Sequence, residues 1–202
     1  MTAPASIILR ALRLVIRPLT QADRTAWCEM MVASEAAFVR SGMIVEPNVT
    51  LDQRFDQAME KTQRTLEAET GYRFQAFLAP GQPGAGLMIG GAALNNVARG
   101  VFQNADMGWG IRSDFEGKGY AFELCSAVLD FAFALPPAGL GLHRVQANVM
   151  PDNERSLRLT TRLGFRREGM ALRMLHIMGD WRDHVMHAKL ADEHRAASDV
   201  RG

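Results

Sequence analysis

Two strand–turn–helix units follow one another in the sequence and constrain its fold more than any other feature. In the first, a strand over residues 105–112 leads through the turn EGKGYA to a helix over residues 119–135; in the second, a strand over residues 143–150 leads through PDN to a helix that ends near Leu163. A helix that opens from such a turn presents free backbone N–H groups and the positive end of its dipole, which together bind phosphate. The two turns therefore predict a site where backbone N–H groups converge on one bound group.

The rest of the sequence adds strands and helices in an order typical of a mixed α/β domain. A first strand is predicted over residues 12–16. One helix is predicted from capping residues at 20–23 through Trp27 and Met31, and a second from the candidate N-cap Thr50 through Leu66. Further strands are predicted over residues 74–78, 87–94, 169–177 and 182–190. We expect one domain over residues 1–202, with a core from about 12 to 190, a connecting segment over residues 95–104 and a frayed polar tail over residues 191–202.

Charge and cysteine content exclude several classes of protein. The formal net charge is +1, and the sequence has no clustered excess of Lys and Arg of the kind that binding to nucleic acid or an anionic membrane requires. No stretch reaches the roughly 20 apolar residues of a membrane span, and three arginines interrupt the apolar N-terminal stretch. Cys28 and Cys125 lie far apart, which is typical of a reducing compartment. We expect a cytoplasmic protein that binds neither nucleic acid nor a membrane.

The glycine turn matches neither of two common nucleotide-binding patterns. A P-loop would need Gly in place of Arg112 and Ser or Thr in place of Gly119, and a dinucleotide fingerprint would need a third Gly in place of Phe122. A glycine turn by itself is most often only a tight turn. Its position directly before the longest predicted helix, with Lys118 in it, favours a ligand-binding role.

Several short motifs resemble one family. The turn is similar to the pyrophosphate-binding loop Gln/Arg-x-x-Gly-x-Gly/Ala of the GCN5-related N-acetyltransferase (GNAT) superfamily, with Glu116, Gly119 and Ala121 at its fixed positions. Glu116 departs from the usual Gln or Arg. Further segments resemble the ribosomal-protein-alanine N-acetyltransferases of the RimJ and RimL type: NNVARG (95–100), MGW (107–109), HRVQAN (143–148), MPDNERS (150–156) and WRDHV (181–185).

This resemblance implies a fold and a cofactor. The implied fold is the α/β acyl-CoA N-acyltransferase fold, a mixed, mostly antiparallel, twisted sheet flanked by helices. Its strands at residues 105–112 and 143–150 should splay apart to admit acetyl-CoA, the acetyl donor, and no metal is expected. The implied cofactor-binding residues are Ile111, Arg112, Gly117, Lys118, Gly119, Tyr120, Ala121, Asn148, Asn153 and Ser156. Asp152 or Asn153 also suits the cap of the second helix, and both roles are compatible.

Acetyl transfer to an amine requires loss of a proton from the amine, stabilisation of an oxyanion and departure of a thiolate. Asp106 is the candidate base, acting directly or through a water, although a single Asp on a strand is more often only solvated. Many members of the family carry a Tyr where this sequence has Thr160, which is a poor general acid. Ser156 is therefore the candidate donor to the thiolate, and backbone N–H groups around residues 109–111 are the expected oxyanion donors.

The acceptor stays open at this level. An α-amino group has a pKa of about 7.7–8.0 and a Lys side chain about 10.4, so a protein N-terminus needs less help from a base. We expect direct transfer to such an N-terminus, that of a ribosomal protein if the resemblance holds. The alternatives are a small amine such as an antibiotic or polyamine, a lysine side chain, or a catalytically weak CoA-binding protein associated with the ribosome. A monomer and a homodimer are both compatible with the sequence.

Overall fold

The computed structural model describes residues 7–40, 42, 45 and 48–199. Within these residues a single sheet contains β1 (Leu9–Arg10), β2 (Leu14–Arg17), β3 (Tyr72–Leu78), β4 (Met88–Ala98), β5 (Asn104–Ile111), β6 (Arg144–Val149), β7 (Arg166–Ile177) and β8 (Asp180–Leu190). The strand order is β1-β2-β3-β4-β5-β6-β8-β7. All neighbours pair antiparallel except β5 and β6, which are parallel. The predicted mixed, mostly antiparallel sheet is confirmed.

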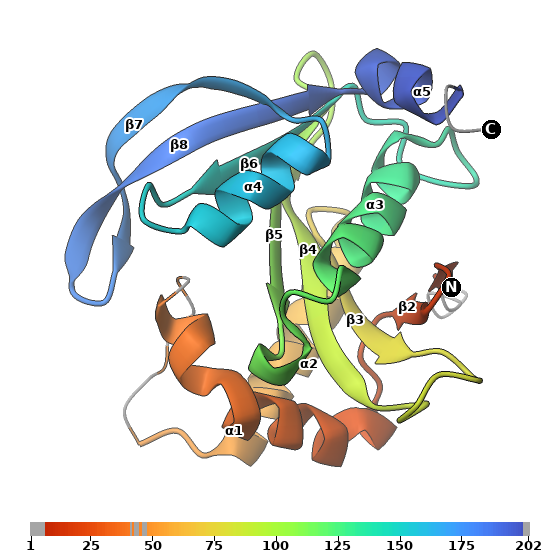
Figure 1. Cartoon of the computed structure of the whole chain (residues 1–202), viewed down its shortest axis with the longest axis vertical. Coiled ribbons are helices and arrows are strands. Elements are labelled where there is room, and N and C mark those ends of the chain that lie inside the picture. The colour runs from red at the N-terminus through yellow and green to blue at the C-terminus, as the bar shows by residue number, and fades with distance from the viewer. Residues whose placement is uncertain (1–6, 41, 43–44, 46–47, 200–202) are drawn as a thin grey trace.

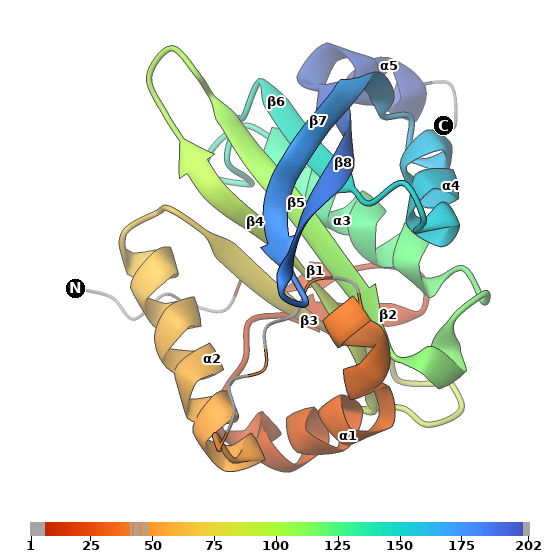
Figure 2. The ribbon, with the colours of Figure 1, turned by 90° about the vertical axis from the view of Figure 1, so that its left-hand side faces the viewer.

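Helices cover both faces of this sheet (Figures 1 and 2). They are α1 (Arg24–Arg40), α2 (Leu51–Glu67), α3 (Tyr120–Phe133), α4 (Glu154–Arg162) and α5 (Ala191–Asp199), with short 3₁₀ turns η1 (Gln21–Asp23) and η2 (Ser113–Phe115). Figure 2 shows α3 and α4 on one face and α2 on the other, with α1 across the end of the sheet. No helix in the described part of the chain is long and apolar enough to cross a bilayer.

Local sequence signals set the helix ends. At α2 the predicted cap Thr50 forms a capping box: the Gln53 backbone N–H donates to the Thr50 hydroxyl oxygen (3.2 Å), and the Thr50 N–H donates to the Gln53 side-chain oxygen (2.9 Å). At α3 the residue before the helix is Gly119, whose φ of +85° lies in the left-handed region. The glycine turn thus joins β5 to α3, as predicted.

The main core lies between the sheet and α3. The predicted apolar stripe of α3 is buried there, including Leu124, Cys125 and Val128, each with no exposed surface. Phe131 of the same helix packs edge-on against Tyr72 and Phe74 of β3, with ring centroids 5.5 Å apart in each pair. Full burial of side chains of this size contributes about 1.5–3 kcal/mol each, so this contact fixes α3 to the sheet and the glycine turn with it.

The parallel pair β5–β6 is short. Its register runs from Asn104 opposite Arg144 to Asp106 opposite Gln146 and stops there, although both strands continue. Beyond these three pairs the strands diverge, which confirms the splay predicted between residues 105–112 and 143–150. The sheet therefore has an opening in its interior, next to the N-terminal ends of α3 and α4.

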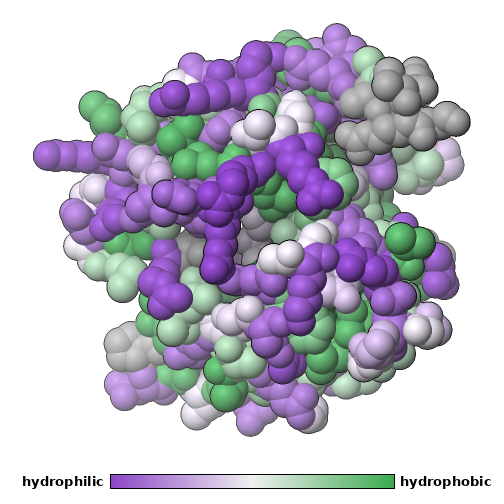
Figure 3. Space-filling model, in the orientation of Figure 1, coloured by the Kyte–Doolittle hydropathy of each residue, from purple (hydrophilic) through white to green (hydrophobic). Residues whose placement is uncertain are grey.

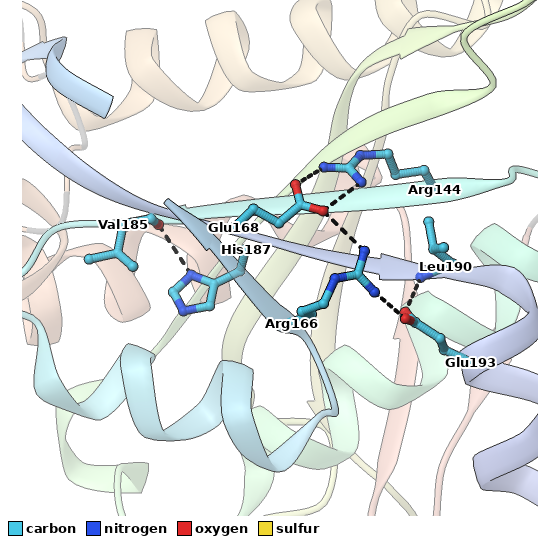
Figure 4. Close-up of polar contacts among 7 residues, drawn as sticks. All are labelled: Arg144, Arg166, Glu168, Val185, His187, Leu190 and Glu193. Carbon is cyan, nitrogen blue, oxygen red and sulfur yellow. Dashed lines mark hydrogen bonds and ion pairs between the residues drawn. The ribbon is translucent and has the colours of Figure 1, made fainter. Parts of the chain in front are cut away.

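A polar network fastens the C-terminal elements at the start of β6, where β5 and β6 still pair (Figure 4). Arg144 on β6 binds Glu168 on β7 through both guanidinium ends, and Glu168 also accepts from Arg166 at 3.1 Å. Arg166 in turn pairs with Glu193 on α5, whose second oxygen accepts the N–H of Leu190 at 2.8 Å. The hydrogen bond from Arg144 is the largest cause that lowers the pKa of Glu168. The network holds the edge strand β7 and α5 to β6.

Three sequence predictions were wrong in detail. Leu12 is not a strand residue: it is 89% exposed in the turn between β1 and β2, and β1 is too short to produce a periodic pattern. The segment 95–104 is not all connection, since β4 continues to Ala98. The tail is helical as α5 up to Asp199, because tertiary contacts such as Glu193–Arg166 hold a polar segment that periodicity could not predict. Residues 200–202 lie outside the described part.

Candidate active site

A groove of about 570 Å³ lies between the glycine turn and α4, a volume ordinary for a small-molecule site. Figure 3 shows hydrophilic side chains around the hollow on this face of the molecule. Phe38 of α1 and Trp109 of β5 contribute apolar surface to its inner part. The groove is lined by these predicted site residues: Ile111, Gly117, Gly119, Tyr120, Ala121, Asn153 and Ser156.

The glycine turn forms one wall of the groove. Gly117 and Gly119 have φ of +73° and +85°, a conformation that costs about 1–2 kcal/mol for a residue with a side chain. A Cβ added to Gly117 would meet no atom within 4 Å, so the space over this backbone is open. The first N–H groups of α3 begin here and have no partner inside the helix. This wall suits an anion such as a diphosphate.

Arg112 and Lys118 do not direct their side chains into the groove. The Arg112 guanidinium donates two hydrogen bonds to Asp114 (2.9 and 3.0 Å), and the Lys118 ammonium donates to the carbonyl of Asp114 (2.8 Å). Both side chains also lie near the Phe115 ring. We therefore still predict that these two residues bind the cofactor, but through their backbone atoms and not through their side chains.

Arg13 holds the turn from behind, a role that the sequence did not reveal. It lies just before β2, and its Nε donates to the Glu123 carboxylate of α3 at 2.8 Å. Its Nη1 donates to the carbonyl of Lys118 at 3.2 Å, and its guanidinium lies 4.1 Å from the centre of the Tyr120 ring. One side chain thus joins the start of β2 to the turn and the first helical residues, and keeps the N–H groups in place.

The N-terminal half of α4 forms the opposite wall. Asn153 is the N-cap, since its side-chain oxygen accepts the N–H of Ser156 at 3.1 Å. The structure therefore confirms the capping role for Asn153, and the Ser156 side chain lies on the groove. Thr160 has no exposed surface, and its hydroxyl donates to the carbonyl of Leu157 at 2.8 Å. A hydroxyl committed in this way does not serve as an acid at the groove.

The groove wall made by α4 is also basic. Arg155, Arg158 and Arg162 recur at helical spacing and all line the groove, and the Arg162 guanidinium lies 4.2 Å from the centre of the Phe122 ring. Arg155 forms an ion pair with Glu116 of the glycine turn, which joins the two walls. This pair links residues far apart in sequence and could not be predicted from it.

At the inner end of the opening, Asp106 is the last β5 residue that pairs with β6. It lies in register with Asn95 on β4 and Gln146 on β6, on the sheet face away from α3. Its carboxylate accepts a hydrogen bond from the Asn96 amide at 2.8 Å. Asn96 has φ of +51° at an irregularity of β4, and such bulges re-aim side chains. Asn96 is a positioning residue that the sequence did not reveal.

Backbone donors face the opening. In an antiparallel pair the N–H groups of successive residues point to opposite strands. The Arg112 N–H donates to the carbonyl of Ile89 on β4, so the N–H groups of Trp109 and Ile111 point the other way, toward the divergent β6. They are placed where the sequence predicted oxyanion donors.

Asn148 of β6 also lies past the last β5–β6 pair. Its side-chain oxygen is buried and has no hydrogen-bond partner among the described residues. A buried acceptor without a partner is costly, so this atom fits a ligand that donates a hydrogen bond inside the opening. The amide groups of a pantetheine arm supply such donors.

Neither cysteine is placed for nucleophilic chemistry. Cys125 is fully buried in α3, and burial raises the pKa of its thiol. Burial is also the main cause that raises the pKa of Cys28, which lies on α1 away from the groove. The described residues contain no group of three or more His, Cys, Asp or Glu side chains that could hold a metal ion.

A comparison with protein families assigns most of the chain. Residues 13–166 match the family described as "Acetyltransferase (GNAT) domain". The chain belongs to the GNAT acetyltransferase family. Membership confirms the resemblance noted in the sequence, the fold, and acetyl-CoA as the acetyl donor.

Individual relatives of this GNAT chain are named as acetyltransferases. It is 42% identical over 101 residues to the [ribosomal protein uS5]-alanine N-acetyltransferase of Escherichia coli, a match that spans 50% of each chain. It is 30% identical over 183 residues to the "Probable N-acetyltransferase YjcK" of Bacillus subtilis, covering 91% of this chain and 97% of that one. RimJ of Mycobacterium smegmatis, solved with CoA-disulfide, superposes with a TM-score of 0.75 at 23% identity over 96% and 94% of the chains.

The residues present fit acetyl-CoA. The glycine turn and the arginines of α4 suit its diphosphate, and the orphan oxygen of Asn148 suits an amide of the pantetheine arm. The divergence of β5 and β6 gives that arm a route toward Asp106. The predicted residues thus fall into two groups, a mouth at the turn and an inner end at Asp106 and Asn148.

Proposed function

We propose that this protein is an acetyl-CoA-dependent N-acetyltransferase that acetylates the N-terminal α-amine of a protein. The observation that carries the proposal is the opening between β5 and β6, with an anion-binding turn at one end and a carboxylate at the other. The similarity to the uS5-alanine N-acetyltransferase supports a ribosomal protein as the acceptor. The chain spans about half the length of that relative, so the acceptor is part of the proposal.

The acceptor amine reaches the site from the face of the sheet that carries Asp106. An α-amine with a pKa of about 7.7–8.0 is partly neutral near pH 7, so it needs only modest help to lose its proton. Asp106, held by Asn96 at 2.8 Å, takes this proton directly or through a water. Glycine at position 108 leaves open space next to Asp106 on the same face, since a Cβ there would meet no atom within 4 Å. That space admits a narrow chain end.

The remaining steps use groups along the opening. Bound acetyl-CoA supplies an activated acetyl group whose thioester is attacked by the amine. The N–H groups of Trp109 and Ile111 stabilise the oxyanion that develops on the carbonyl oxygen. Ser156 donates a proton or a hydrogen bond to the departing thiolate, since the Thr160 hydroxyl is committed to Leu157. Direct transfer in a ternary complex follows, because neither cysteine lies at the site.

The test measures release of free CoA thiol from acetyl-CoA in the presence of short peptides. We expect release with peptides that begin with Ala or Ser, and none when the same N-terminus is blocked. Asp106→Asn should lower kcat about 100-fold and leave the affinity for CoA unchanged, since general-base catalysis contributes roughly 10²–10⁴-fold. Asp56→Asn removes an exposed carboxylate of α2 and serves as the control.

Three results would contradict the proposal in different ways. Acceleration by a polyamine or an aminoglycoside, but by no peptide, would replace the protein acceptor and keep acetyl transfer. Release that requires a lysine side chain would instead place the acceptor on Lys. Failure of acetyl-CoA to bind at all would refute the cofactor site itself.

A further inference from the structure

The mouth of the groove contains a carboxylate in an unfavourable position for a phosphate-binding site. Glu116 begins the glycine turn, lines the groove, and has a side chain that is only 32% exposed. A carboxylate in such a place repels the diphosphate of a CoA ligand, and partial burial weakens the screening by solvent. Some other group must offset this charge if the groove binds CoA.

Arg155 supplies the offsetting charge from the other wall. It lies in the first turn of α4 and pairs with Glu116 of the glycine turn across the mouth of the groove. The Arg155 side chain is 73% exposed, so solvent and not packing surrounds most of it. It can therefore change partners without disturbing the core.

The other two arginines on this wall have partners outside the glycine turn. Arg158 donates to Glu154 of the same helix at 3.1 Å, and Arg162 lies over the Phe122 ring. Arg155 is the arginine on this wall that the structure pairs with the glycine turn. A guanidinium binds carboxylate and phosphate through the same planar pair of N–H groups, so one can replace the other as its partner.

We propose that Arg155 is a binding residue for the diphosphate of the CoA ligand, and that its ion pair with Glu116 closes the mouth of the groove until a diphosphate displaces the carboxylate. This inference rests on the proposed function and adds selectivity to it. A ligand with a diphosphate releases the pair because its charge competes with Glu116. A pantetheine compound without phosphate gains nothing from Arg155. Glu116 thus keeps Arg155 occupied in the free protein and sets the threshold for binding.

The experiment measures the Kd of CoA, 3′-dephospho-CoA and pantetheine by calorimetry at two salt concentrations. The proteins are the full chain and its variants Arg155→Gln, Glu116→Gln and the double variant. Arg64→Gln is the control, because the Arg64 side chain is about as exposed as that of Arg155 and pairs with Glu60 on α2, away from the groove. The melting temperature of each variant is recorded without ligand to confirm that it is folded.

We expect Arg155→Gln to weaken CoA and dephospho-CoA by the same factor, about tenfold or more, as for loss of a charge-assisted hydrogen bond. Glu116→Gln should tighten both ligands several-fold, and the double variant should bind both more tightly than Arg155→Gln does. Pantetheine should bind all variants alike, and the effect on CoA should shrink at high salt.

Three outcomes would overturn the inference. In the first, Arg155→Gln binds CoA as tightly as Arg64→Gln does. In the second, the double variant binds CoA no more tightly than Arg155→Gln. In the third, Arg155→Gln loses affinity for CoA but not for dephospho-CoA, which would assign Arg155 to the 3′-phosphate. Each leaves the proposed function standing as long as the unmodified chain binds CoA. If the unmodified chain does not bind CoA, the proposed function fails as well.

Discussion

Replacing Asn148 by Leu should make the free protein more stable and the CoA complex weaker. The substitution keeps the branched shape and the number of side-chain heavy atoms, and it removes a buried oxygen that has no partner among the described residues. An unsatisfied buried polar group costs about 1–3 kcal/mol. If the opening between β5 and β6 accepts a hydrogen bond donor from the cofactor, this cost is compensated only in the complex.

The expected changes in melting temperature and in affinity for CoA both follow from the side-chain oxygen of Asn148. Removing about 1.5 kcal/mol of unfavourable burial raises the melting temperature of a chain of this size by roughly 3–6 °C. Loss of one neutral hydrogen bond to the ligand, worth about 0.5–1.5 kcal/mol, weakens CoA about 2- to 10-fold. Thermal unfolding of the free protein and calorimetric titration with CoA measure the two effects separately.

Asn104 provides a matched control. Its side-chain oxygen is also buried without a partner in the described part of the chain, but it lies on β5 where β5 and β6 still pair. Asn104→Leu should therefore raise the melting temperature similarly and leave the affinity for CoA unchanged. The reasoning is refuted if Asn148→Leu lowers the melting temperature, or if both variants bind CoA with the same affinity.

Two further predictions concern stability. Asp23 is buried, and both of its carboxylate oxygens accept hydrogen bonds from Arg17 (2.7 and 2.8 Å). Burial favours a higher pKa for this carboxyl, but the hydrogen bonds from Arg17 and Thr20 outweigh burial, so the pKa of Asp23 is lowered. The carboxylate therefore stabilises the fold above its unfolded pKa of about 3.9 and loses this effect as the pH falls through the lower folded pKa. Asp23→Asn should cost about 2 kcal/mol in urea unfolding at pH 7 and progressively less below about pH 4; a cost that does not change with pH would contradict this. Gly119→Ala and Gly81→Ala, at φ of +85° and +88°, should each lower stability by about 1–2 kcal/mol, and only Gly119→Ala should weaken CoA; equal affinities for CoA would show that the turn is not a binding wall.

Much of the fold could be predicted because its signals are local. The helix after the glycine turn was predicted over residues 119–135 and is Tyr120–Phe133, since apolar spacing and Pro136-Pro137 mark it without reference to the rest of the chain. α5 could not be predicted in this way. It is polar, and it is held by contacts such as that between His194 and Asp130 of α3, at 2.7 Å.

The candidate site also combines residues fixed by local signals with residues whose positions depend on distant contacts. Motif residues such as Gly119 and Ser156 lie on the groove because each is fixed by its own turn or cap. The direction of the Lys118 side chain depends on a carbonyl four residues away, and the partner of Glu116 is 39 residues away in sequence. Neither relation has a periodic signal. Motifs therefore predicted which segments meet at the groove, while the side chains that open or close it required coordinates.

The shortness of the β5–β6 pair has a mechanical consequence. In the described part of the chain, three register pairs join β5 to β6, whereas the antiparallel pairs on both sides of this junction are longer. The two parts of the sheet are thus joined by a narrow junction that ends at Asp106 and Gln146. A molecule bound beyond this junction contacts both parts of the sheet at once and adds contacts between them. Cofactor binding would then fix the angle at which the acceptor face meets Asp106, and so couple loading of the donor to alignment of the amine.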